Sequence, residues 1–213
     1  MISVIGGTGK IGFGLVMRFA LADEELAIGS RNLEKAARAV EKVRAAVPGA
    51  RVVAMENQEA VSKGDILFLT IPYSAQKSTL KFLERVLEDK ILVSMVNPFR
   101  RINGEFRSIP IEEGSAAEEA QKALPKVKVI SAFKNISSEM FLDVGKPLSC
   151  DTVVCSDYEG PKRKVMDLAR KLGIKPLDGG KLRSSRHLDA ITVLLLNLNS
   201  RYKASTCFKI DGL

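Results

Sequence analysis

The chain has 213 residues, of which 46% are hydrophobic and 27% charged, which is typical of a globular protein and excludes a disordered or fibrous one. Its 33 basic residues against 25 acidic ones give a net charge of +8, which indicates either a polyanionic ligand or simply a solvated basic surface. Aromatic residues make up only 6% of the chain, and Trp is absent, which disfavours nucleic acid because single-strand binders need stacking platforms. The single histidine, His187, leaves no basis for a histidine triad or a histidine-based metal site.

The first motif is a glycine loop between a predicted strand and a predicted helix. The apolar run 2–5 is typical of a strand buried on both faces, and apolar residues recur at helical spacing over 13–21. Glycine lets a pyrophosphate approach the backbone closely, and the helix start turns free N–H groups toward its charge. We therefore predict dinucleotide binding at the residues of this G-x-G-x-x-G loop, which are Gly7, Thr8, Gly9, Lys10, Ile11 and Gly12.

The end of the second predicted strand, 26–29, indicates which dinucleotide binds. An NAD-binding protein usually places Asp or Glu there to hold the ribose hydroxyls. This chain has Ser30 and Arg31 instead, and Lys35 follows one turn into a predicted helix over 33–47. A hydroxyl, a guanidinium and an ammonium group are suited to a 2′-phosphate, so the sequence favours NADP over NAD.

Strands and helices alternate along the rest of the chain, with predicted strands at 51–55, 66–71, 91–96, 127–132 and 151–155 and helices between them. This alternation predicts an α/β fold: a doubly wound, mostly parallel Rossmann sheet with a small C-terminal α/β annex. We place a boundary near Ser156, between an NADP-binding domain (1–156) and a C-terminal domain (157–213) that completes the acceptor cleft. We expect 100–114 to be a loop or lid, and the apolar last helix, 185–202, to cross the cleft or form a homodimer contact.

The carboxyl ends of parallel strands form the ligand-binding edge of such a sheet. We expect Tyr73 to flank the adenine or ribose, and Pro72 and Pro98 either to wall the ring or simply to make turns. Lys134 is the only charged side chain at these strand ends, so it is a candidate to bind an acidic ligand or donate a proton. The candidate residues are Ile71, Pro72, Tyr73, Asn97, Pro98 and Lys134.

Several further features concern the compartment of the protein. Cys150, Cys155 and Cys207 show no metal-binding spacing, so we expect free thiols in a reducing environment and no metal. The apolar run 191–198 is far shorter than the roughly 20 residues that span a bilayer. We expect a cytoplasmic protein with no leader peptide and no membrane partner.

Taken with these motifs, the chain resembles the coenzyme F420-dependent NADP reductases of archaea and actinobacteria. The resemblance extends nearly end to end and includes 6–12, 29–31, 69–72, 115–118, 129–132 and 176–182. It implies that residues 8–11 with Ser30, Arg31 and Lys35 hold the NADP phosphates. It also implies that Tyr73, Asn97 and Ser138 line the nicotinamide side of the cleft.

The same resemblance implies hydride transfer between NADP and the deazaflavin coenzyme F420, with no obligatory catalytic acid or base. Arg100 and Arg101 are candidates for the anionic tail of the deazaflavin. The chain departs from the family at Lys134, where histidine is expected, and over 203–207. Two alternatives therefore stay open: an NADPH-dependent reductase of an imine, carbonyl or ferric acceptor, with Lys134 as proton donor to an imine or carbonyl, and a non-enzymatic NADP-sensing module.

Overall fold

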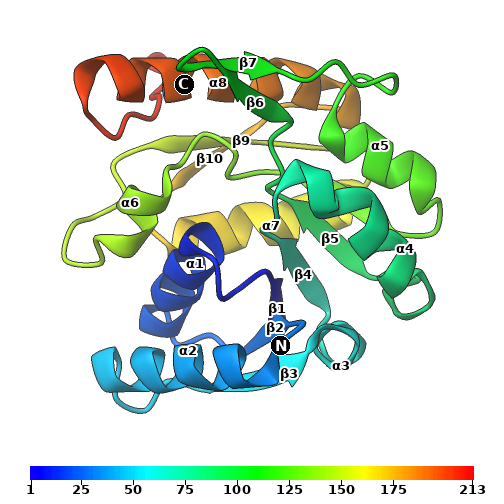
Figure 1. The fold of residues 1–213 in the computed structure, drawn as a ribbon, viewed down its shortest axis with the longest axis vertical. Coiled ribbons are helices and arrows are strands. Elements are labelled where there is room, and N and C mark those ends of the chain that lie inside the picture. The colour runs from blue at the N-terminus through cyan, green and yellow to red at the C-terminus, as the bar shows by residue number, and fades with distance from the viewer.

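The computed structural model describes residues 1–213 as one eight-stranded sheet with helices packed against it (Figure 1). The strand order is β10-β9-β8-β5-β4-β1-β2-β3, and every pair is parallel except β8 with β9. The predicted doubly wound, mostly parallel Rossmann sheet is confirmed. The strands are β1 (Ile2–Ile5), β2 (Leu26–Ser30), β3 (Val52–Glu56), β4 (Ile66–Leu69), β5 (Ile91–Ser94), β8 (Lys128–Ser131), β9 (Asp151–Ser156) and β10 (Lys175–Asp178).

The helices cover both faces because the strands bury side chains on both sides. Neighbouring residues of one strand point to opposite faces, so Val4 belongs to an apolar cluster of 31 buried residues and Ile5 to another of 19. This double burial explains the unbroken apolar runs in the sequence. The helices are α1 (Lys10–Leu21), α2 (Leu33–Ala46), α3 (Asn57–Lys63), α4 (Gln76–Leu87), α5 (Ala116–Ala123), α6 (Ser138–Leu142), α7 (Glu159–Lys171) and α8 (Ser185–Tyr202), with single 3-10 turns η1 (Tyr73–Ala75) and η2 (Leu182–Ser184).

The strand register sets the edge at which a ligand can bind. Ile5 at the end of β1 lies beside Leu69 at the end of β4, which lies beside Ser94 of β5. Ser94 in turn lies beside Ser131 at the end of β8. The loops that follow these four strands therefore leave the sheet at one edge, where the strand order changes direction and open α/β sheets bind ligands.

The expectation of a loop over 100–114 is wrong for most of its length, because the chain forms an antiparallel hairpin of β6 (Phe99–Ile102) and β7 (Glu105–Ser108). Its two-residue turn is Asn103 and Gly104, both at positive φ (50° and 87°), as a tight hairpin turn requires. The hairpin lies along α8 at the top of the molecule (Figure 1). This segment is therefore a folded β-hairpin packed on α8 and not a free loop.

Helix α6 was not predicted, and its position depends on α1. A Cβ on Gly14 of α1 would lie 2.7 Å from the Cβ of Phe141 in α6, so only glycine permits this close approach. The buried guanidinium of Arg18 donates hydrogen bonds to the carbonyl oxygens of Met140, Phe141, Asp143 and Lys146. Met140 and Phe141 lie in the last turn of α6, where carbonyl groups have no partner within the helix, and the other two carbonyl groups belong to the segment that follows. As a result, α1 and residues 138–146 form one packed unit.

The C-terminal part continues the same sheet through β9 and β10. The boundary predicted near Ser156 falls at the end of β9, and the division into 1–156 and 157–213 stays a prediction. All three cysteines are free, as predicted, and the structure buries Cys150 and Cys155. None of the helices combines the length and apolar character needed to cross a membrane.

Candidate functional site

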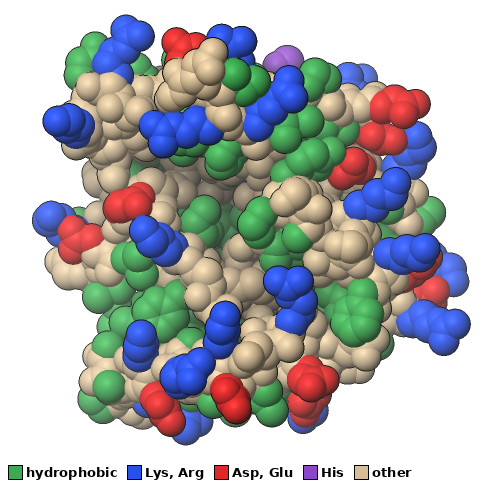
Figure 2. Space-filling model, viewed as in Figure 1, with side chains coloured by type: hydrophobic (Ala, Val, Ile, Leu, Met, Phe, Trp, Pro, Cys, Tyr) green, Lys and Arg blue, Asp and Glu red, His purple; other side chains and the backbone are tan.

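A cleft of about 630 Å³ opens at the ligand-binding edge of the sheet. Figure 2 shows this hollow below the layer that contains α8 and the hairpin. Its walls come from five places: the glycine loop (Ile11), the segment after β5 (Asn97), the hairpin, residues 134–139, and the C-terminal half of α8 with 203–206. The cleft therefore brings together five of the predicted residues, namely Ile11, Asn97, Arg101, Lys134 and Ser138.

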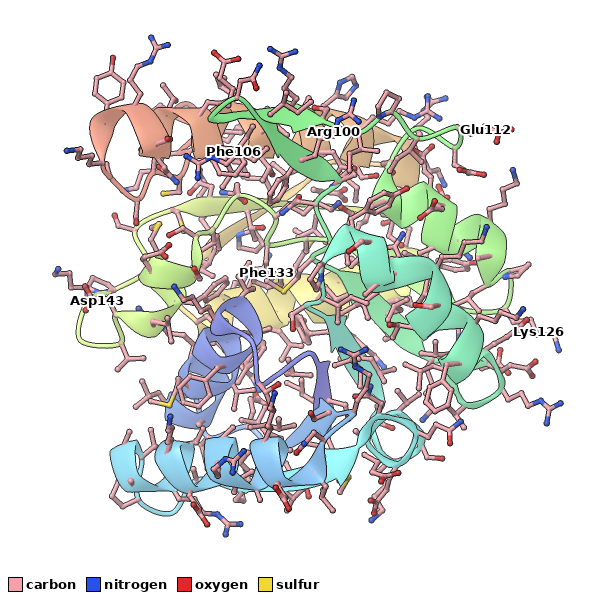
Figure 3. All side chains as sticks on the ribbon, viewed as in Figure 1. Arg100, Phe106, Glu112, Lys126, Phe133 and Asp143 are labelled. Atoms are coloured by element: carbon pink, nitrogen blue, oxygen red, sulfur yellow. The ribbon has the colours of Figure 1, made fainter.

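The hairpin gives the cleft an aromatic roof. The rings of Phe99 and Phe106 meet edge to face with centroids 5.5 Å apart, and the guanidinium of Arg101 lies 5.5 Å from the Phe106 centroid. Figure 3 shows Phe106 at the hairpin and Phe133 lower down, toward α1. Leu195 of α8 adds apolar surface from the same side. An aromatic and aliphatic wall of this kind suits a planar ring.

The glycine loop has two separate functions in the structure. A Cβ on Gly12 would lie 2.4 Å from the carbonyl oxygen of Gly6, and one on Gly7 would lie 3.0 Å from Ile28, so these glycines allow tight packing of the loop and α1 on the sheet. A Cβ on Gly9 would meet only the Gly6 oxygen at 3.3 Å. The helix start at Gly9 has no side-chain cap and no acidic residue in its first turn, so its N–H groups are available to an anion.

A second cavity of about 480 Å³ lies beside the glycine loop and contains only basic charges. Thr8, Gly9 and Lys10 form one side of it, and exposed residues of α2 form the other. The sequence reasoning included Lys35 but missed Arg38 and Lys42. Their spacing of three and four residues along one helix was the signal that would have found them. The cationic side chains of this basic cavity are Lys10, Lys35, Arg38 and Lys42.

The turn after β2 holds its side chains in a defined arrangement. Ser30 is buried, and its Oγ accepts a hydrogen bond from the backbone N–H of Asn32 at 3.1 Å. Asn32 caps α2 by accepting from the backbone N–H of Lys35 at 2.9 Å, a role that the sequence reasoning missed. The side chains of Arg31 and Lys35 stay exposed beside this fixed turn. The Ser30 hydroxyl keeps its own proton available to donate.

Lys134, a candidate to bind an acidic ligand or donate a proton, has a buried side chain that is only 1% exposed. Its ammonium group donates to the carbonyl oxygen of Val96 at 2.7 Å and forms an ion pair with Asp189 of α8. Burial lowers the pKa of Lys134 and raises the pKa of Asp189. The ammonium therefore points into the protein and not toward a ligand, because its ion-pair partner Asp189, 55 residues away in the chain, is itself buried.

Of the six residues predicted at the strand ends, four do not line the cleft: Ile71, Pro72, Tyr73 and Pro98. The hydroxyl of Tyr73 donates to Glu119 of α5 at 3.0 Å, and burial together with this carboxylate raises the pKa of Tyr73 to about 12. Ile71 packs on the smaller apolar cluster, and the Pro98 carbonyl accepts from the N–H of Ile109 at 2.9 Å. Their assignment to the cofactor site stays a prediction.

The fold and the cleft define a class: a Rossmann-type protein with a glycine loop after β1 and a cleft at the same sheet edge. Residues 1–98 match the family model of coenzyme F420-dependent NADP oxidoreductases. The chain is 38% identical to the F420-dependent NADP reductase of Methanocaldococcus jannaschii over 210 residues, covering 95% of this chain and 94% of that one. It is 39% identical to the F420-dependent NADP reductase of Methanothermobacter thermautotrophicus over 208 residues, covering 94% and 89%.

The chain therefore belongs to the coenzyme F420-dependent NADP oxidoreductase family, and the resemblance stated from the sequence is confirmed. The fold has a solved counterpart in a protein from an Arthrobacter species, with a TM-score of 0.84 at 20% identity and 98% of each chain covered. That likeness over nearly the whole length supports the fold, including β9, β10 and the last helix.

Proposed function

We propose that this protein transfers a hydride between NADP(H) and coenzyme F420. The observation that carries the proposal is one continuous cleft that joins Ile11 of the glycine loop and Asn97 after β5 to the aromatic roof of Phe99 and Phe106. Two flat rings that exchange a hydride must lie against each other, and a single cleft with an apolar wall provides that space. The family relationship to F420-dependent NADP reductases supports the same reaction.

The residues present fit NADP. The uncapped start of α1 and the open space at Gly9 suit the pyrophosphate, and Arg31 with the basic cavity suits the 2′-phosphate. The Oδ1 atom of Asn97 is buried without a hydrogen-bond partner, so it can accept from the carboxamide of a nicotinamide. No acidic side chain lines the basic cavity, which agrees with a ligand that carries an additional phosphate.

When bound, the nicotinamide and deazaflavin rings supply the hydride chemistry themselves. The chain orients them: Asn97 would hold the nicotinamide amide, while Phe99, Phe106 and Leu195 would exclude water from the reacting faces. Arg101 lies at the cleft and would bind an anionic part of the deazaflavin. The burial of Lys134 argues against an imine or carbonyl reductase in which this residue protonates the substrate.

An anaerobic assay tests the reaction. Purified protein is mixed with oxidised coenzyme F420 and either NADPH or NADH, and the visible absorbance of the deazaflavin is followed. We expect rapid loss of absorbance with NADPH and little with NADH. Absence of any loss, with NADPH binding shown by calorimetry, would contradict the proposed acceptor.

We further propose that the protein is a cytoplasmic homodimer. Three free thiols suit a reducing compartment. Ile191, Leu194 and Tyr202 of α8 are 38%, 58% and 70% exposed, which supports an apolar contact between two copies of this helix. Sedimentation of the wild type and of a Leu194→Glu variant is the test: we expect a dimer and a monomer. A monomeric wild type at micromolar concentration would contradict the dimer.

A further inference from the structure

The chain leaves β8 through a residue in an unusual backbone conformation. Phe133 has a φ of 59°, in the left-handed region that an aromatic residue rarely adopts. Its ring is buried at 5.8 Å from that of Phe68, and its backbone N–H donates to Oγ1 of Thr152 at 2.8 Å. Such a conformation persists only where the surroundings fix it, and residues of this kind cluster at functional sites. Here it turns the chain toward the cleft directly before Lys134.

Lys134 and Asp189 together connect four parts of the structure: the segments after β8 and β5, helix α8 and the start of α5. Its ammonium contacts the Val96 carbonyl after β5 and the carboxylate of Asp189 in α8. The other carboxylate oxygen of Asp189 accepts from the backbone N–H of Ala116 at the start of α5 at 3.1 Å. The lysine and aspartate side chains are 1% and 8% exposed. A buried ion pair with further hydrogen bonds of this kind fixes geometry more than it adds stability.

Asn97 is held by Lys134 from two sides. The Lys134 ammonium binds the carbonyl oxygen of Val96, the residue directly before Asn97. The Lys134 carbonyl oxygen accepts a hydrogen bond from Nδ2 of Asn97 at 3.2 Å. This bond uses the donor end of the carboxamide and leaves Oδ1, which is buried and unpartnered, as the free end. Asn97 and Lys134 both line the cleft.

We propose that Lys134 and Asp189 are positioning residues that aim the Asn97 carboxamide, so that Oδ1 accepts a hydrogen bond from the nicotinamide carboxamide of NADP. This inference rests on the proposed function and deepens it, because it assigns Lys134 to orientation of the nicotinamide half and not to proton donation. Lys134 acts through Asn97. A variant that removes the ion pair should therefore affect only ligands that contain nicotinamide.

The test is a calorimetric comparison of two ligands and four proteins. The ligands are NADP⁺ and adenosine 2′,5′-bisphosphate, which carries the 2′-phosphate but lacks nicotinamide. The proteins are the wild type, Asn97→Ala, the paired variant Lys134→Met with Asp189→Asn, and the triple variant. The paired variant avoids an unpaired buried charge, and Asn at 189 keeps an acceptor for the Ala116 N–H.

We expect the paired variant to bind NADP⁺ about tenfold more weakly, the loss of roughly one well-placed hydrogen bond. Its affinity for adenosine 2′,5′-bisphosphate should equal that of the wild type. The triple variant should bind NADP⁺ no more weakly than Asn97→Ala, because residues that act through one contact are not additive. Equal losses for both ligands, or additive losses in the triple variant, would overturn the positioning role. A wild type that binds neither ligand would instead overturn the proposed NADP site.

A second measurement needs no ion-pair variant and covers the case in which the paired variant fails to fold. The side-chain amide signal of Asn97 in ¹⁵N-labelled wild-type protein is assigned by its loss in Asn97→Ala. We expect this signal to shift on addition of NADP⁺ and to stay in place on addition of adenosine 2′,5′-bisphosphate. A signal that is unmoved by NADP⁺ would overturn the assignment of Asn97 to the nicotinamide and, with it, the role of Lys134.

Discussion

The carboxamide of Asn197 in α8 pairs with both backbone groups of Phe106 in β7: its Oδ1 accepts from the N–H and its Nδ2 donates to the carbonyl oxygen, each at 2.8 Å. One side chain thus replaces the neighbouring strand that β7 lacks on this edge. It fixes the roof of the cleft to the last helix. The position of the Phe106 ring over the cleft therefore depends on a contact 91 residues away.

We expect Asn197→Ala to loosen this roof and raise the KM for coenzyme F420 about tenfold. Two lost hydrogen bonds of about 1 kcal/mol each set the scale. The Kd for NADPH should stay within about twofold of the wild type, because α2 with its part of the basic cavity lies at the opposite end of the molecule from the hairpin (Figure 1). Steady-state kinetics with each substrate varied in turn is the measurement. A rise in the NADPH Kd with an unchanged KM for F420 would place the acceptor elsewhere.

The preference for NADPH over NADH depends on the turn after β2. We expect Arg31→Asp to remove this preference, because the new carboxylate repels a 2′-phosphate and can accept from ribose hydroxyls. The change corresponds to about 2–4 kcal/mol in relative kcat/KM, given the strength of hydrogen bonds to charged groups. The ratio of kcat/KM for the two nucleotides is measured. An unchanged ratio would show that Arg31 does not contact the phosphate.

The basic cavity predicts a role for a residue that the sequence reasoning missed. Arg38→Ala should raise the Kd for NADPH by about three- to tenfold and leave the Kd for NADH nearly unchanged. It should also make NADPH binding less sensitive to salt, since one charge contact is lost. The matched control is Lys81→Ala, an exposed lysine on α4 outside this cavity. If Arg38→Ala and Lys81→Ala have equal effects, Arg38 contributes only to the general surface charge and does not contact the phosphate.

Tyr73 provides a pH-dependent signature of the contact between η1 and α5. Its pKa is raised to about 12 by burial and by Glu119, whereas a tyrosine in the unfolded chain titrates near 10. A raised pKa in the folded state stabilises the fold below pH 10, and this contribution is lost as the pH rises through about 12. Stability should therefore fall more steeply between these values in the wild type than in Tyr73→Phe. The difference in tyrosinate absorbance between the wild type and Tyr73→Phe reports on Tyr73 alone, and it should titrate near pH 12. A difference that titrates near pH 10 would contradict the contact.

The sheet and the glycine loop could be predicted because their causes are local. Three of the four residues of Ile2–Ile5 are apolar because both faces of β1 are buried, and Gly9 precedes a helix start that can be seen in the sequence. The hairpin was missed although Asn103 and Gly104 are a strong turn signal. The flanking residues 99–102 and 105–108 carry several charges and show little of the apolar alternation expected of strands.

The position of Lys134 could not be predicted from its neighbours in the chain. Its surroundings are decided by Asp189, which looks like an ordinary polar residue on an amphipathic helix until α8 folds across the sheet edge. Arg18 is a similar case, because its partners are backbone carbonyls of a short helix that has no clear sequence pattern of its own. Buried charges find their partners through tertiary structure, and a single sequence does not show them.

The most direct test of the central claim follows the hydride itself. NADPH carrying deuterium in place of both hydrogens at the nicotinamide C4 is mixed with oxidised coenzyme F420 and the protein, and the reduced deazaflavin is examined by mass spectrometry. Direct transfer within one cleft predicts one deuterium in each molecule of reduced F420, with no exchange into water. Reduced F420 without deuterium, or no reduction at all, would contradict hydride transfer between the two coenzymes in this cleft.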